Sequence, residues 1–309
     1  MKIFRDFEAV HSIRNAIVTT GSFDGVHLAH KVILERLKKL AKEIEGETVV
    51  ITFQPHPAKV LYPETAGRDL RLINSEREKI QLLTKAGLDN LIIVNFTLEF
   101  SKTTSSEFVR NWLIQKLNAR KIVIGFNHHF GHNREGDYQK LREMGMEFGF
   151  DVEEIPEQDI RSETISSGAI RQALQEGDIE KANVYLDHHY LIIGDIHEIV
   201  SGNDVPGFQG FVVDSGEENK LYPKRGGYAV SIMNDERAFP GICQINDNNE
   251  NNGSTKVELY LFDDHEPFIG KEAVVLFHKR IRDHAIPLQG ISLREQLLQD
   301  RILIESLIL

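Results

Sequence analysis

Apolar runs and amphipathic stretches alternate along the first half of the chain. Short β-branched runs predict strands at 17–20, 48–53, 91–95, 121–125 and 151–155. Between them, apolar residues at the spacing of one helical face predict helices at 26–40, 74–87, 105–117 and 138–148. This alternation favours an open parallel sheet with helices on both faces.

The pattern changes past about residue 188, where strand-like runs follow one another with turn residues between them. Two short helical segments come first, and strands are then predicted at 190–200, 210–213, 227–233, 257–262 and 272–279. Such a series is typical of an antiparallel barrel or sandwich, and a helix is predicted at 293–308. We therefore expect an α/β fold with a parallel-sheet domain over residues 1–186 and an antiparallel β-barrel domain over 187–309.

The stretch 19–30 joins a strand end to a helix start through a turn with two glycines, Gly21 and Gly25. The free N–H groups and the positive end of the helix dipole make such a corner an anion site. His27 and His30 are three residues apart in the first helical turn, so both side chains are expected on one side. A plain strand–helix corner with surface histidines is an equal alternative from spacing alone.

Three further unusual loops follow predicted strands, at 54–72, 125–137 and 161–168. Ligands of open α/β sheets bind at the carboxyl ends of the strands, so these loops are expected at one edge with the stretch 19–30. Each loop also has a simpler interpretation. His56 between two prolines can bond its own backbone, and the histidines of 125–137 lack the neighbours of a zinc site.

Composition limits the classes of function. The chain has 309 residues, 41% hydrophobic and 27% charged, which fits a globular protein with two domains. A formal charge of −11 argues against nucleic acid as a partner. Cys243 is the one cysteine, so no internal disulfide is possible. Because no apolar run approaches membrane-spanning length and the first residues lack a signal-peptide pattern, we expect no membrane association and a cytoplasmic location.

Four motifs in the first domain resemble the bifunctional prokaryotic riboflavin kinase/FAD synthetases. The stretch 21–30 resembles the family's nucleotide motif, and 52–57 resembles its T-F-x-P-H-P. The stretch 125–137 resembles G-x-[ND]-F-x-F-G…R-x-G-D, and 165–171 resembles I-S-S-T-x-I-R. The order and spacing agree along the whole first domain. The chain departs from the family at three positions, namely Ala29 for Gly, Gly168 for Thr and His128 for an aromatic ring.

The resemblance implies that the first domain is a Rossmann-like nucleotidyltransferase domain that transfers AMP from ATP to FMN. Mg²⁺ with ATP is the implied cofactor, and FMN and FAD are substrate and product. The residues that match the catalytic role are His27, His30 and Arg171. Those that match nucleotide binding are Gly21, Ser22, Phe23, Asp24, Ser166 and Ser167. Those that match flavin or phosphate binding are Phe53, His56, Asn127 and Arg134.

The second domain resembles the family's riboflavin kinase barrel less closely. Glu258, in the stretch 257–263, matches the proposed base that activates riboflavin toward ATP. The family's G-x-P-T-A-N motif is absent between Tyr190 and Tyr222, where 203–211 stands instead. Its Thr and Asn would serve Mg²⁺ and nucleotide, so riboflavin kinase activity is expected to be lost or much weakened. An exposed strand residue with no catalytic role is an equal alternative for Glu258.

Two other functions remain open. One is a related nucleotidyltransferase with another acceptor, such as nicotinate nucleotide or phosphopantetheine, although the appended barrel argues against it. The other is a protein that binds or senses flavin without turnover, which the changes at Ala29 and Gly168 leave open. The sequence leaves the Mg²⁺ ligands and the oligomeric state undetermined.

Overall fold

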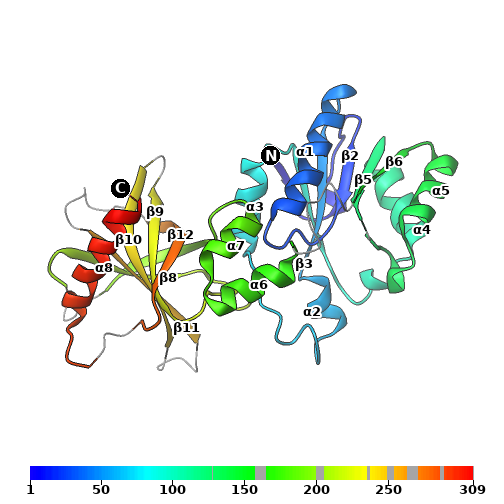
Figure 1. The fold of residues 1–309 in the computed structure, drawn as a ribbon. Coiled ribbons are helices and arrows are strands. Elements are labelled where there is room, and N and C mark those ends of the chain that lie inside the picture. The colour runs from blue at the N-terminus through cyan, green and yellow to red at the C-terminus, as the bar shows by residue number, and fades with distance from the viewer. Residues whose placement is uncertain are drawn as a thin grey trace. The chain divides into compact units, whose positions relative to one another are not determined.

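The computed structural model describes residues 1–126, 128–156, 165–199, 205–234, 237–248, 254–262, 271–285 and 289–308. The chain divides into two compact units, and most of their helices and strands are labelled in Figure 1. The first unit contains Met1–Leu70 and Lys79–Ile165, and the second contains Arg71–Glu78 and Ser166–Leu309. The boundary between domains that the sequence predicts, between residues 186 and 187, stays a prediction.

A parallel sheet forms the centre of the first unit. In the described part of the chain its six strands are ordered β1-β4-β3-β2-β5-β6, and each neighbouring pair is parallel. The strands are β1 (Lys2–Phe4), β2 (Ile17–Thr20), β3 (Thr48–Gln54), β4 (Asn90–Asn95), β5 (Lys121–Gly125) and β6 (Asp151–Ile155). The predicted parallel sheet is confirmed. The edge strand β1 was not predicted, because its three residues are too few to show a periodic pattern.

Helices cover both faces of this sheet, as predicted. Their bounds are α1 (Leu28–Glu43), α2 (Pro57–Leu61), α3 (Glu76–Lys85), α4 (Ser105–Glu107) and α5 (Tyr138–Phe148). A π-helical stretch, Phe108–Lys116, continues α4. Single 3₁₀ turns lie at Phe7–Ala9, Phe100–Lys102 and His132–Arg134. The segment 54–72, expected as an irregular loop, contains α2, because Pro57 occupies the first helical position, where proline is favoured.

Two apolar layers hold the helices to the sheet. Side chains of a strand point to opposite faces in turn. Val18 accordingly packs with Leu113 and with α5, whereas its neighbour Ile17 packs with Leu37 of α1 and Leu83 of α3. The central strands β2 to β5 are therefore largely buried on both faces, which explains their continuous apolar runs.

The second unit contains a closed antiparallel barrel with the strand order β10-β11-β8-β7-β12-β9. Its strands are β7 (Leu191–Glu198), β8 (Phe208–Asp214), β9 (Gly226–Asn234), β10 (Arg237–Asn248), β11 (Ser254–Phe262) and β12 (Glu272–Arg282). Its helices are α6 (Ser167–Glu176), α7 (Ile179–Leu186) and α8 (Leu293–Ile308). The sequence pattern was typical of either a barrel or a sandwich, and the predicted β-barrel is confirmed. The strand β10 was not predicted, because Pro240, Gly241 and the polar residues near its end mask the alternation.

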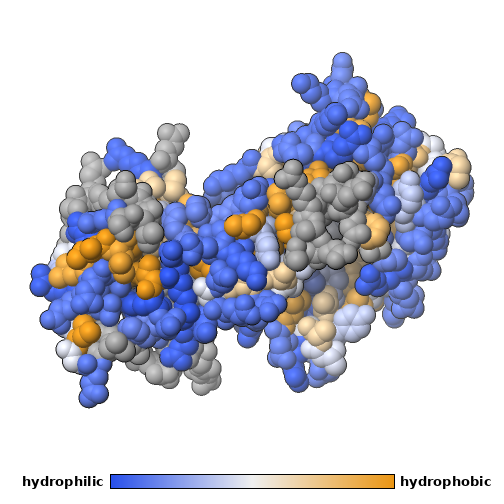
Figure 2. All heavy atoms as spheres, in the orientation of Figure 1, coloured by the Kyte–Doolittle hydropathy of each residue, from blue (hydrophilic) through white to orange (hydrophobic). Residues whose placement is uncertain are grey.

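The outer surface is mostly hydrophilic on the face drawn in Figure 2, with smaller apolar patches, one of them over α8. Three apolar residues of α8 are exposed, namely Leu298, Ile302 and Leu303. Among the described residues, no helix combines the length and the hydropathy needed to span a membrane.

A buried ion pair fixes the segment 71–78 within the second unit. Lys220 Nζ lies 2.6 Å from Glu78 Oε2, and neither side chain has exposed surface. Lys220 also donates to the carbonyl oxygens of Ile73 at 2.6 Å and Leu191 at 3.1 Å. Glu78 in turn accepts a hydrogen bond from the Ile193 N–H at 3.0 Å. Each charge is thus paired and hydrogen-bonded, as burial requires.

Replacing Lys220 with methionine is expected to destabilise the second unit strongly. The substitution leaves the Glu78 carboxylate buried without its cation, which costs about 3–5 kcal/mol in comparable pairs. The free energy of unfolding is measured by urea denaturation followed by circular dichroism. Adding Glu78→Gln to Lys220→Met should recover part of the loss, because the charge is then removed as well.

Lys2 provides the control, because its ion pair with Glu47 spans 3.7 Å and the lysine side chain is 69% exposed. Lys2→Met is expected to change the free energy of unfolding by no more than about 1 kcal/mol. If Lys220→Met changes the stability as little as Lys2→Met does, the buried pair is not the constraint described here.

Candidate active site

The turn between β2 and α1 has an unusual backbone. Phe23 and Val26 have positive φ angles of 48° and 42°, in the left-handed region that costs energy for residues with a side chain. Gly25, with φ of 93°, occupies a position that glycine tolerates. The Gly21 N–H donates to the Ile51 carbonyl at 3.0 Å, which joins the turn to β3. The predicted strand, glycine turn and helix are confirmed.

His27 and His30 form a stacked pair at the start of α1. Their ring centroids are 3.7 Å apart with an angle of 18° between the planes. His27 is 6% exposed, and the Phe23 ring lies 4.8 Å from the His30 ring. Both side chains thus lie on one side of the helix, as expected, and the alternative of two surface histidines is wrong.

His30 is a neutral imidazole in the ligand-free site at pH 7. Burial lowers the pKa of His30 well below its usual value of 6.5, and the His27 ring and the Lys79 ammonium lower it further. Its Nδ1 is buried and has no hydrogen-bond partner within the described residues. A neutral imidazole has one nitrogen that donates and one that accepts. An unsatisfied nitrogen at a helix start is a position for a ligand to bind.

Lys79 is a buried residue of this site that the sequence analysis did not find. It is 7% exposed, and its Nζ donates to the Ser22 carbonyl at 2.8 Å and lies 3.4 Å from Thr52 Oγ1. Thr52 Oγ1 also donates to the Ser22 carbonyl, at 3.1 Å. The signal was present, since Lys79 stands four residues before the fully buried Leu83 and hence on the apolar face of α3.

Aromatic rings line the next part of the first unit. Phe53, at the end of β3, lies 5.6 Å from Phe96 and 6.1 Å from Phe100 between ring centroids. The series continues through Phe108 to Phe130, with centroid distances of 6.4 and 6.2 Å. Phe53 and Phe130 are both half-buried against the core, which agrees with their interpretation as core or pocket wall. Flavin contact by Phe53 stays a prediction.

His56 is bonded to its own backbone, as its simpler interpretation predicted. It precedes α2 as the N-cap, and its Nδ1 accepts the Ala58 N–H at 3.2 Å. A role of His56 in flavin or phosphate binding stays a prediction.

The basic residues of the loop 125–137 differ in exposure and in their contacts. Asn127 lies outside the described residues. Arg134 is exposed and has a positive φ of 59°. Burial lowers the pKa of His128 to about 4, with smaller contributions from His129 and Arg134. His132 Nδ1 lies 3.0 Å from the Ser101 carbonyl oxygen. Within the part of the chain that the structure describes, no cluster of His, Cys, Asp and Glu is arranged to hold a metal ion.

The later motif belongs to the second compact unit. Ser166 caps α6, and its Oγ accepts the Ala169 N–H at 3.2 Å. Ser167 is the first residue of that helix, and the Arg171 Nε donates to the Arg71 carbonyl at 2.9 Å. A Cβ on Gly168 would meet only Ser166 Oγ, at 3.6 Å, so the backbone there does not demand glycine. The convergence of Ser166, Ser167 and Arg171 with the histidine pair stays a prediction.

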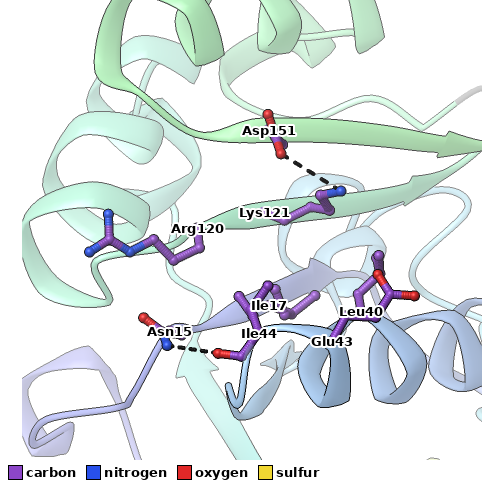
Figure 3. A pocket seen from close by; sticks show the side chains of 8 residues that line it. All are labelled: Asn15, Ile17, Leu40, Glu43, Ile44, Arg120, Lys121 and Asp151. Atoms are coloured by element: carbon purple, nitrogen blue, oxygen red, sulfur yellow. Dashed lines mark hydrogen bonds and ion pairs between the residues drawn. The ribbon is translucent and has the colours of Figure 1, made fainter.

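A pocket of about 370 Å³ lies elsewhere in the first unit (Figure 3). It is lined by Asn15, Ile17, Leu40, Glu43, Ile44, Arg120, Lys121 and Asp151. Three of these, Ile17, Lys121 and Asp151, begin the parallel strands β2, β5 and β6. The pocket is therefore at the amino ends of the strands, opposite the edge that carries the histidine pair.

Glu258 lies in β11 of the barrel and forms an ion pair with a neighbour. Its Oε1 lies 2.9 Å from Lys256 Nζ, and its side chain is 15% exposed. The side chain is therefore partly buried, and both the catalytic role and the alternative without one stay predictions. A second ion pair of this unit joins β12 to α8. It is buried, and it spans 2.9 Å between Arg282 Nε and Asp300 Oδ2. Residues 203 and 204, in place of the absent motif, lie outside the described residues.

The fold is that of a two-unit protein, with a parallel-sheet unit that has a strand–turn–helix corner and a unit built on a closed β-barrel. Residues 10–169 match the family described as FAD synthetase, and residues 207–307 match the family described as riboflavin kinase. The chain belongs to the family of bifunctional riboflavin kinase/FMN adenylyltransferases.

Relatives of that name are similar over most of their length. The enzyme from Listeria monocytogenes is 31% identical over 271 residues, which cover 87% of this chain and 84% of the relative. The enzyme from Escherichia coli K12 is 28% identical over 310 residues, covering 98% and 96%. A solved structure titled as a macrolide-efflux protein from Streptococcus pneumoniae has a TM-score of 0.81 and 24% identity, covering 99% of this chain and 98% of that one. This last similarity concerns the fold alone.

His30 is expected to stay neutral in the ligand-free protein at pH 6, where an exposed histidine with a pKa near 6.5 is mostly protonated. The pKa of His30 is lowered in the folded state, so unfolding takes up a proton below pH 6.5. The stability that neutral His30 contributes is thus present above pH 6.5 and falls as the pH drops toward the folded pKa. Nuclear magnetic resonance of the ring protons, assigned with His30→Gln, measures the titration. A His30 pKa of 6.5 or higher would contradict this description.

Proposed function

We propose that this chain transfers the adenylyl group of ATP to FMN, forming FAD and releasing pyrophosphate. The observation that carries the proposal is the stacked pair of the buried His27 and the partly buried His30 at the start of α1. Membership of a family that includes FAD synthetases supports the same reaction. The related reaction with another acceptor is less well supported, because the chain also matches the riboflavin kinase family.

In this reaction an oxygen of the FMN phosphate attacks the α-phosphorus of ATP. The new phosphorus–oxygen bond forms as the bond to pyrophosphate breaks, and pyrophosphate leaves with the electron pair. The FMN phosphate is already ionised at neutral pH, so no strong general base is required. The rate enhancement then comes from positioning the two phosphates and from stabilising the negative charge that builds up during transfer.

The residues of the turn are assigned to that stabilisation. The N–H groups of Ser22 and Phe23 and the start of α1 attract the phosphates of ATP, whereas the Gly21 N–H is bonded to Ile51 and Gly21 contributes by shaping the turn beside the nucleotide. His27 and His30 donate hydrogen bonds to phosphate oxygens and do not abstract a proton. The neutral state of His30 favours this role over that of a fixed cation. Asp24, 2% exposed, helps to shape the turn.

The other substrate contacts come from the later motifs. We assign Ser166, Ser167 and Arg171 to the β- and γ-phosphates, because a serine-capped helix start and a guanidinium both bind anions. Phe53, His56, Asn127 and Arg134 are assigned to FMN and its phosphate.

Mg²⁺ accompanies ATP in this proposal. Mg²⁺ commonly keeps several waters and takes oxygen ligands from the phosphates of its nucleotide. When bound, it neutralises charge on the leaving pyrophosphate. No nucleic acid, no membrane and a cytoplasmic location complete the proposal, in keeping with the acidic composition.

For the barrel we infer a riboflavin-binding domain in which phosphorylation of riboflavin by ATP is slow. The bifunctional names of the relatives favour kinase activity, whereas two features of this chain oppose it. The P-T-A-N residues that would organise Mg²⁺ and nucleotide are absent from the sequence. The Glu258 carboxylate, the base in this step, is engaged by Lys256 at 2.9 Å.

FAD formation tests the first activity. The pure protein with ATP, Mg²⁺ and FMN is expected to yield FAD and pyrophosphate, separated by chromatography. His27→Ala and His30→Ala should each lower kcat about 100-fold, because each removes a donor to the transferring phosphate, with little change in FMN affinity. His11→Ala, at an exposed position of the same unit, is the control. A yellow protein that binds FMN but forms no FAD would instead support the flavin-sensing alternative.

Riboflavin in place of FMN tests the barrel. FMN is expected to appear much more slowly from riboflavin than FAD appears from FMN. Glu258→Gln should abolish the remaining kinase activity, because the amide cannot accept the hydroxyl proton, while FAD formation from FMN stays unchanged. Phosphorylation of riboflavin at a rate equal to adenylyl transfer would contradict the inference for the barrel.

A further inference from the structure

Lys79 fixes the backbone of the turn at one carbonyl group. The Ser22 carbonyl accepts hydrogen bonds from Lys79 Nζ at 2.8 Å and from Thr52 Oγ1 at 3.1 Å. A hydrogen bond from an ammonium is stronger than one between neutral groups. Lys79 and Thr52 are 7% and 1% exposed, so water competes little for the carbonyl. The orientation of this one peptide group is therefore determined by two side chains from other elements.

That orientation controls a neighbouring donor. In a trans peptide the carbonyl and the following N–H point in opposite directions. A Ser22 carbonyl held toward Lys79 turns the Phe23 N–H away from Lys79. Phe23 also has the left-handed φ of 48°, which needs support from surrounding contacts. Release of the Ser22 carbonyl would let the turn relax and move this donor.

Lys79 also places a positive charge beside the histidine pair. The groups that act on His30 are the His27 ring, stacked at 3.7 Å, and the Lys79 ammonium, and the Phe23 ring at 4.8 Å adds an apolar contact. In a site with little water, a charge acts over several ångströms. The ammonium repels a proton from His30 and attracts an incoming phosphate.

We propose that Lys79 is a positioning residue for adenylyl transfer: it holds the Ser22–Phe23 peptide so that the Phe23 N–H faces the nucleotide phosphates, and it supplies a positive charge beside His30. The inference rests on the proposed FMN adenylyltransferase activity. It adds to that proposal a residue from α3, which none of the four sequence motifs contains.

The test compares one substitution at two positions of α3. Lys79→Met keeps the length of the side chain but removes the donor and the charge. It should lower kcat for FAD formation about 10- to 100-fold, because misplaced donors no longer match the transferring phosphate. The KM for FMN should change by less than about threefold, since the change acts on the nucleotide side. Lys85→Met, at an exposed position of the same helix, should retain the kcat of the unchanged protein.

A second readout separates positioning from a purely structural role. In the ligand-free protein, the His30 titration followed by nuclear magnetic resonance should move to higher pH in Lys79→Met and stay unchanged in Lys85→Met. A lysine that only stabilised the fold would lower the melting temperature and leave both kcat of the folded enzyme and the His30 titration unchanged. That result would overturn the proposal.

Lys79→Gln is the second variant, in case the methionine variant fails to fold. It retains an N–H donor without the charge, so it should show the shifted His30 titration and a smaller loss of kcat. A folded Lys79→Gln protein with unchanged kcat and unchanged His30 titration would overturn the proposal. If the unchanged protein makes no FAD from FMN, the proposed function fails by itself. The His30 titration and the affinity for ATP then still decide the role of Lys79.

Discussion

The second unit depends on the buried ion pair between Glu78 and Lys220. Glu78 and Lys220 have no exposed side-chain surface, so either charge alone would be very costly in the interior. The pair also satisfies backbone groups of β7, since Glu78 accepts from the Ile193 N–H and Lys220 donates to the Leu191 carbonyl. The segment 71–78 cannot leave the barrel without exposing these groups unpaired. A piece of the first half of the sequence is for this reason an integral part of the second unit.

Lys79, the next residue after Glu78, belongs to the other compact unit. In the first unit, Lys79 Nζ donates a hydrogen bond to the Ser22 carbonyl. Successive residues of an α-helix are rotated by about 100°, so neighbours such as Glu78 and Lys79 point in different directions. One turn of α3 therefore supplies a buried charge to each unit. Changes in α3 are expected to affect both units, although each unit has its own core.

The helices and strands that were predicted are those with a strong local pattern of apolar residues. The strands β2 to β5 are mostly apolar runs whose residues are largely buried, and their type was predicted correctly. The elements that were missed have weak local signals. Strand β1 has three residues, α2 begins at a proline, and β10 contains Pro240 and Gly241. Their conformations depend on pairing or capping by other segments.

The same distinction applies to the site. His27 and His30 were found because three-residue spacing on a helix already places them together. Lys79 was not found, because its partners Ser22 and Thr52 lie on other elements and only the fold brings them near. The available signal was a lysine on the apolar face of a predicted helix. This signal does not indicate which residues the lysine contacts. Spacing along one helix thus identifies neighbouring residues more readily than partners that only the fold brings together.

The electrostatics of the turn are suited to an anion that arrives from solution. Two imidazoles and one ammonium lie close together, and their mutual repulsion is one reason why His30 stays neutral in the ligand-free protein. A neutral His30 ring avoids the cost of burying a further positive charge close to the Lys79 ammonium. The phosphates of a nucleotide bring negative charge into the same space and offset the repulsion. The charge balance of the turn is therefore more favourable with an anion bound, whereas its left-handed residues are supported by the bonds of Lys79 and Thr52 to the Ser22 carbonyl.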